Sequence, residues 1–161
     1  MQEAIAKGFR LSMADSKCLK DGIDVISGLI TEANVNVKPE GLEIVAMDPA
    51  NVSMVIFRVR NAAFTEYNVH EEQTMGISLS SIKQILKRLK SDDILSLELG
   101  ENRLNISAIG NLSKSFSLPL IALEKKEQRI PELKFSATKS VQCSHLSGYF
   151  SELLHFLRCS L

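Results

Sequence analysis

Two groups of side chains in this sequence could do chemistry. The first consists of four potential zinc ligands near the C-terminus: Cys143, His145, His155 and Cys159. Cysteine thiolates and imidazoles bind zinc, and His155 and Cys159 would share one face of a helix. However, the single residue between Cys143 and His145 is tighter than the roughly two to four residues usual in zinc motifs. The spacing therefore favours accidental placement, and we expect no metal and no cofactor.

The second group is basic. Lys83, Lys87 and Lys90 follow one another at i, i+4 and i+7, and no acidic residue lies between Ser80 and Lys90. Such a face can follow the phosphate backbone of DNA without reading bases, although taken alone the residues favour a solvated helix surface. An upstream helix presents an outward face of mixed charge, formed by Lys17, Lys20, Asp21, Asp24 and Ser27.

The composition excludes several classes of protein. In the 161 residues, 19 Lys and Arg balance 19 Asp and Glu, so any affinity for DNA must come from local segregation of charge. No apolar run approaches the roughly 20 residues of a membrane span, and no apolar signal-peptide core follows Met1, so we expect an intracellular protein. Three cysteines exclude a disulfide framework. No catalytic or phosphate-binding motif is present, so we expect no enzyme.

The elements that must position these side chains recur along the chain. Alternating apolar residues predict a strand at 9–13, helical periodicity predicts a helix at 17–30, and strands follow at 33–38, 42–47 and 52–60. The same order returns with a strand at 73–79, a helix at 82–90 and strands at 94–99, 103–109 and 113–120. Ser81 and Gln84 would form a capping box on the second helix. The repeat of about 64 residues predicts an internal duplication packed as one domain, each copy offering a helix to cover a sheet.

A charged segment at 122–132 favours a linker, and a third copy would begin after it. We expect its strand at 136–143 and its helix at 145–158, after which the sequence ends without the three further strands of a full copy. The apolar stripe of that helix would forgo about 1.5 to 3 kcal/mol of burial per residue if it stayed solvated, so something must cover it.

Five short motifs in this order resemble the archaeal and eukaryotic sliding clamps of the proliferating cell nuclear antigen family. They are LITEA at 29–33, AMDPANV at 46–52, FTEY at 64–67, ILKR at 85–88 and IPE at 130–132. Pro49-Ala50 and the segment 66–68 look more archaeal than eukaryotic. The resemblance implies an α+β DNA clamp fold. Its first domain would span 1–121, with repeats at 9–60 and 73–120, followed by a linker at 122–135 and a truncated second domain at 136–161.

In this family two such domains form a subunit, and three subunits join head to tail in a ring around duplex DNA. The resemblance therefore implies a non-enzymatic processivity factor, cytoplasmic if archaeal and nuclear if eukaryotic. Its partners would be the backbone of double-stranded DNA, DNA polymerase, the clamp loader, other proteins with clamp-binding peptides, and further clamp subunits. Two alternatives stay open: a clamp-like protein that regulates full-length subunits without encircling DNA, and a decayed copy.

The resemblance also assigns site residues. The family lines its hole with helices, which gives DNA-binding roles to Lys17, Lys20, Lys83, Lys87 and Lys90. A partner peptide would dock in a half-built pocket formed by Met47, Val52, Met54, Ile130 and Pro131. The alternative for the two methionines is core packing, and alternation along the strand predicts that at least one of them is core.

A last assignment concerns the edge strand at 113–119. In the family this edge pairs with the second domain of a neighbouring subunit, so the resemblance implies a subunit interface at Lys114, Phe116 and Leu118. Alternatively, Phe116 packs within its own sheet and Pro119 protects the edge from pairing.

Overall fold

The structure of the chain is a computed structural model that describes residues 8–90, 92–123, 130, 134, 136 and 137. Of the predicted strand at 136–143 the structure describes only Ser136 and Ala137, and neither lies in a strand. The rest of that strand, the predicted helix at 145–158 and the four candidate zinc ligands lie outside the described residues. In chain order the elements are β1 (Arg10–Met13), α1 (Lys17–Ile26), β2 (Glu32–Lys38), β3 (Gly41–Met47), β4 (Met54–Arg60), the 3-10 helix η1 (Asn61–Ala63), β5 (Glu66–Asn68), β6 (Gln73–Ser78), α2 (Leu79–Lys87), β7 (Ile94–Leu99), β8 (Arg103–Ile109) and β9 (Lys114–Pro119).

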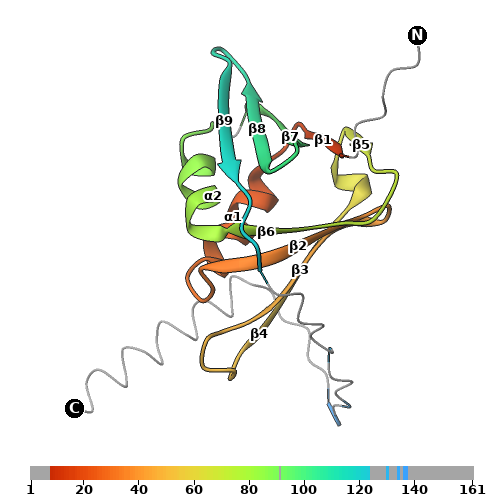
Figure 1. Cartoon of the computed structure of the whole chain (residues 1–161), viewed down its shortest axis with the longest axis vertical. Coiled ribbons are helices and arrows are strands. Elements are labelled where there is room, and N and C mark those ends of the chain that lie inside the picture. The colour runs from red at the N-terminus through yellow and green to blue at the C-terminus, as the bar shows by residue number, and fades with distance from the viewer. Residues whose placement is uncertain (1–7, 91, 124–129, 131–133, 135, 138–161) are drawn as a thin grey trace, which may run out of the picture. The chain divides into compact units, whose positions relative to one another are not determined.

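The strands form two antiparallel sheets, in the orders β5-β1-β7-β8-β9 and β4-β3-β2-β6 (Figure 1). The first strand of each repeated unit pairs in the sheet of the other unit. β1 lies against β7, with Leu11 opposite Leu97, and β6 lies against β2, with Ile77 opposite Ala33. Each sheet therefore joins strands from both repeats, and neither repeat could build it alone. Two helices with two antiparallel sheets confirm the predicted α+β class.

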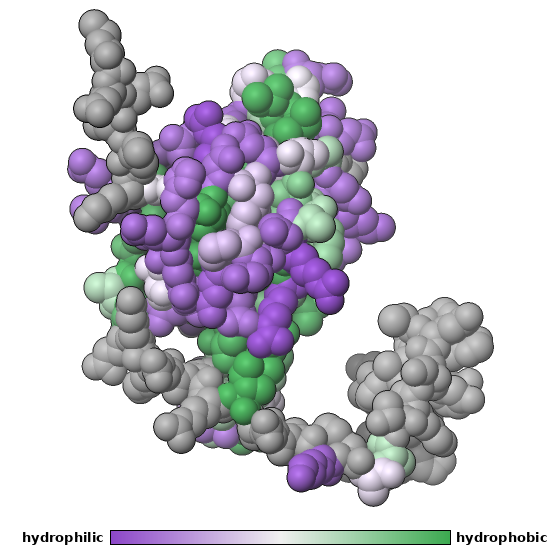
Figure 2. Space-filling view, turned by 90° about the vertical axis from the view of Figure 1, so that its right-hand side faces the viewer, coloured by the Kyte–Doolittle hydropathy of each residue, from purple (hydrophilic) through white to green (hydrophobic). Residues whose placement is uncertain are grey.

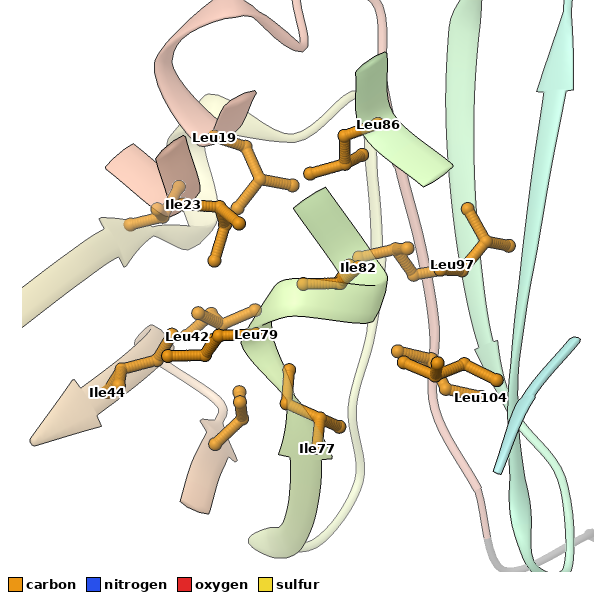
Figure 3. Packing of buried hydrophobic residues seen from close by; sticks show 14 of the residues in the cluster. Leu19, Ile23, Leu42, Ile44, Ile77, Leu79, Ile82, Leu86, Leu97 and Leu104 are labelled. Atoms are coloured by element: carbon orange, nitrogen blue, oxygen red, sulfur yellow. The ribbon is translucent and has the colours of Figure 1, made fainter. Parts of the chain in front are cut away.

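The two helices lie side by side and bury their apolar stripes against the sheets (Figure 1). α1 contributes Leu19, Ile23 and Ile26, and α2 contributes Leu79, Ile82 and Leu86. Figure 3 shows most of these side chains converging with residues from β3, β6, β7 and β8. α2 contacts β2 and β6 of one sheet and β9 of the other, so it packs against both.

The sheets are also tied together by a tyrosine. Tyr67 on β5 donates a hydrogen bond through its hydroxyl to the carbonyl oxygen of Lys38, at 2.5 Å, and Lys38 ends a strand of the other sheet. Burial raises the pKa of Tyr67 to about 12. The phenol therefore stays protonated at neutral pH and keeps its donor proton.

Three helix boundaries were predicted wrongly. α2 begins at Leu79 instead of Ile82, because the side chain of Ser78 accepts a hydrogen bond from the backbone N–H of Ser81, at 3.3 Å. The predicted capping box at Ser81 is therefore wrong, and Lys90 follows the helix instead of lying in its last turn. α1 ends at Ile26 rather than Ile30.

Beyond β9, the chain forms an antiparallel bridge with β6, the edge strand of the four-stranded sheet. The backbone N–H of Ile121 donates to the carbonyl oxygen of Gly76, at 2.9 Å. A Cβ at Gly76 would lie 2.2 Å from the Ile121 carbonyl oxygen, so only glycine admits this approach. No helix in the part of the chain that the structure describes is long and apolar enough to span a membrane.

Replacing Ile82 with Ala tests the burial of α2. Ile82 lies between the two sheets and is only 4% exposed, so we expect the free energy of unfolding to fall by about 2 to 5 kcal/mol. Urea denaturation followed by circular dichroism measures the loss. Gln84→Ala on the exposed side of the same helix is the control, with an expected change within about 0.5 kcal/mol. Equal effects of the two substitutions would contradict the described packing.

Candidate nucleic-acid interface and docking surfaces

α1 and α2 present a shallow groove between their outward faces. It has a volume of about 250 Å³ and is lined by Lys20, Asp21, Asp24, Lys83, Leu86 and Lys87. Three of the five lysines predicted to bind DNA are therefore brought together from two helices far apart in sequence. Because the apolar stripes of both helices face the core, these charged side chains have only the solvent side left to occupy.

The groove also contains an acidic residue that counters the lysines. The Asp24 carboxylate on α1 lies 3.0 Å from the Lys83 ammonium and 3.8 Å from the Lys87 ammonium, both on α2. A hydrogen bond from Lys83 and its charge hold the pKa of the Asp24 carboxyl below its usual value. The sequence window from Ser80 to Lys90 lacks acidic residues, but the fold supplies one from the neighbouring helix.

Lys20 has a second use, at the end of α2. Its ammonium donates to the carbonyl oxygens of Leu89, at 3.1 Å, and Lys90, at 2.8 Å. From the other side, Lys114 on β9 donates to the carbonyl oxygen of Arg88, at 2.8 Å. Cations at a helix C-terminus satisfy free carbonyls and complement the helix dipole. Both lysines therefore help to terminate α2.

Asp93 completes this turn. It is 5% exposed, its carboxylate accepts a hydrogen bond from the backbone N–H of Lys90 at 2.9 Å, and it lies 3.8 Å from the Lys114 ammonium. Sequence reasoning assigned no role to Asp93. The remaining predicted DNA-binding residues, Lys17 and Lys90, are exposed at the beginning of α1 and just after α2.

The loop between β3 and β4 is held by Asp48. Its carboxylate accepts hydrogen bonds from the backbone N–H groups of Val52 and Ser53, both at 2.8 Å. Asn51 adopts a left-handed backbone with φ of 55°, a conformation that asparagine tolerates. Val52 is therefore a loop residue, 82% exposed, and β4 begins later than the predicted residue 52, at Met54.

Met47 and Met54 lie directly opposite each other on the outer face of the β3–β4 hairpin. The expectation that one of them is core is wrong, because cross-strand partners share a face, and here it is the face opposite to buried Ala46. The next pair on this face is Val45 and Ile56, which sequence reasoning missed. Figure 2 shows apolar side chains gathered in the lower part of residues 8–123, at the level of this hairpin in Figure 1.

The structure does not test whether Ile130 and Pro131 contribute to the predicted pocket. Ile130 is exposed and belongs to a second unit, Arg129–Leu161, whereas the hairpin belongs to Met1–Gln128. Pro131 lies outside the described residues. The contribution of both residues to a pocket therefore stays a prediction.

β9 lies at the edge of the five-stranded sheet and pairs with β8. Lys114, Phe116 and Leu118 turn toward the helices: Leu118 is 5% exposed, and Phe116 packs against the core. Packing of Phe116 within its own sheet, the alternative to an interface role, is therefore observed. The other edge of β9 carries no partner strand among the described elements, which leaves its main-chain groups open to pairing.

The described residues form no metal-binding site. No group of three or more His, Cys, Asp or Glu side chains among them is arranged to hold an ion, and Cys18 is an exposed free thiol. The arrangement offers charge and apolar contact instead.

The sequence and the fold both have known relatives. Residues 9–126 match the family described as proliferating cell nuclear antigen, N-terminal domain. The DNA polymerase sliding clamp of Thermococcus onnurineus is 39% identical over 130 residues, which is 80% of this chain and 52% of the relative. The chain thus spans about half the length of the curated relatives it matches.

Solved structures give the same result. The proliferating cell nuclear antigen of Entamoeba histolytica superposes with a TM-score of 0.75 at 26% identity, covering 78% of this chain and 52% of that one. A complex of two such antigens from Sulfolobus tokodaii gives 0.74 at 26% identity, with the same coverage. The clamp fold expected from the motifs is confirmed, and the chain belongs to the proliferating cell nuclear antigen family, whose N-terminal domain it contains.

Proposed function

We propose that the protein is a DNA polymerase sliding clamp, a processivity factor that works inside the cell by encircling duplex DNA and tethering replication and repair enzymes. The observation that carries this proposal is the pairing of α1 and α2, which gathers Lys20, Lys83 and Lys87 on one solvent-facing groove. Its family membership and its sliding-clamp relatives support the same function. The mechanism is topological, so the protein itself needs no catalytic group.

The groove would meet the phosphate backbone and not the bases. Lysine side chains neutralise phosphates and release condensed counterions, which attracts duplex DNA of any sequence. Such contacts are salt-dependent, and they leave the protein free to move along the helix axis.

Partner enzymes would dock on the opposite surface. Met47, Met54 and the exposed Val52 offer apolar area at a hairpin that Asp48 holds in shape, which suits the apolar side chains of a clamp-binding peptide. The free edge of β9 would add a strand from another clamp subunit. The complex of two antigens from Sulfolobus tokodaii supports association between clamp subunits.

Replacing Lys83, Lys87 and Lys90 together with Ala tests the DNA face. We expect weaker binding to a short duplex and a plot of log K against log salt that is shallower by up to about 2.7, because about 0.9 is lost per phosphate contact. Fluorescence anisotropy between about 10 and 100 mM salt measures both, since charges act over longer distances at low salt.

The control for this variant removes three positive charges elsewhere, at Lys38, Arg60 and Arg103, which lie on β2, β4 and β8. Its salt dependence should stay close to that of the unchanged protein. If both triple variants lose affinity equally, or neither does, the α2 face is not the DNA-binding face.

Val52→Asp tests the peptide surface. Val52 is 82% exposed, so the fold should persist, while a carboxylate at an apolar docking site should weaken binding of a polymerase-derived clamp-binding peptide about tenfold or more. Isothermal titration calorimetry gives the affinity. Leu112→Asp is the matched control, because Leu112 is 73% exposed in the turn between β8 and β9. A peptide that binds both variants as tightly as the unchanged protein would refute this docking site.

A further inference from the structure

Asp24 is the acidic side chain that sits between the lysines of the two helices. One of its carboxylate oxygens is shared by the ammonium groups of Lys83, at 3.0 Å, and Lys87, at 3.8 Å. Lys83 also approaches the backbone carbonyl oxygen of Asp24, at 3.5 Å. A single carboxylate on α1 thus engages both groove lysines of α2.

Stability gives little reason for this arrangement. The side chain of Asp24 is 56% exposed, that of Lys87 is 67% exposed and that of Lys83 is 29% exposed. Ion pairs to a carboxylate this open to water contribute little to folding, because solvent screens them and the lysine side chains lose freedom. The effect of Asp24 is therefore expected on whatever else approaches the two lysines.

We infer that Asp24 limits how strongly the groove between α1 and α2 holds a phosphate backbone, because a phosphate must displace its carboxylate from Lys83 and Lys87. This inference rests on the proposed function and deepens it, since it names the residue that sets the strength of the DNA contact. In a clamp, weaker binding to the phosphate backbone would favour movement along the duplex over arrest at one position.

Asp24 has two opposing effects on phosphate binding, and their relative sizes decide whether it strengthens or weakens the affinity. By holding the lysines in place, the carboxylate would help a phosphate that arrives in the right position. By its charge, it repels that phosphate and competes for the same donors. At 3.8 Å, Lys87 is only loosely held, whereas the charge acts well within the screening distance of about 10 Å at 0.1 M salt. Repulsion and competition should therefore dominate.

Asp24 is charged under the conditions that matter. The hydrogen bond and charge of Lys83 hold the pKa of its carboxyl below the usual value, so the carboxylate persists throughout the neutral range. Asp21, one turn earlier on α1, lines the same groove but forms no ion pair with a described lysine. It therefore offers a control with the same change of net charge.

The test compares Asp24→Asn, Asp21→Asn and Asp24→Glu with the unchanged chain, using anisotropy of a labelled duplex over a salt series. For Asp24→Asn we expect affinity to rise about threefold or more at low salt, and the salt dependence to steepen by about 0.9 to 1.8 as one or two lysines become available to phosphates. Asp21→Asn should give a smaller gain with an unchanged slope. Asp24→Glu keeps the charge and should behave like the unchanged protein.

Each other outcome counts against the inference in a distinct way. Equal gains and slopes for Asp24→Asn and Asp21→Asn would show a general charge effect and overturn the role of the ion pairs. Unchanged or weaker binding by Asp24→Asn would show that placing the lysines matters more than countering them. If none of the proteins binds duplex even at low salt, while circular dichroism shows them folded, the proposed DNA contact itself fails.

Discussion

Burial of the apolar stripes of α1 and α2 is the constraint on which the rest of the structure depends. Each sheet is built from strands of both repeats, so the two helices can reach their apolar partners only by packing together. Leu11 on β1, Leu79 on α2 and Ile106 on β8 are fully buried in the resulting core. With the inward faces used in this way, the charged faces of both helices are left adjacent on the surface, and that adjacency creates the groove.

Where the residue pattern was clean, the sequence predicted the fold accurately. The strands at 94–99 and 103–109 have the predicted bounds because their apolar residues alternate and turn residues flank them. α1 begins at the predicted Lys17. The start of α2 was missed because three serines, Ser78, Ser80 and Ser81, compete as caps. β5 and η1 were missed because three residues are too few to show a period.

In the candidate site, too, the features local to one element were predicted and the contacts between elements were not. The spacing of Lys83 and Lys87 along one helix is local, and sequence reasoning found it. The pairing of these lysines with Asp24, and the use of Lys20 to cap α2, depend on how two helices far apart in sequence come to lie side by side, since Asp24 and Lys83 are separated by 59 positions. The outward positions of both helices were visible in the sequence, but one sequence contains no signal for which residues face each other across the groove.

The surface that duplex DNA contacts is the central claim to test. Backbone amide shifts, recorded by nuclear magnetic resonance while a short duplex is added at low salt, locate that contact residue by residue. We predict that the largest changes fall in α1, α2 and the turn at 88–90, with the outer face of the four-stranded sheet unaffected. Changes centred on β3 and β4, or spread evenly over the surface, would contradict the account.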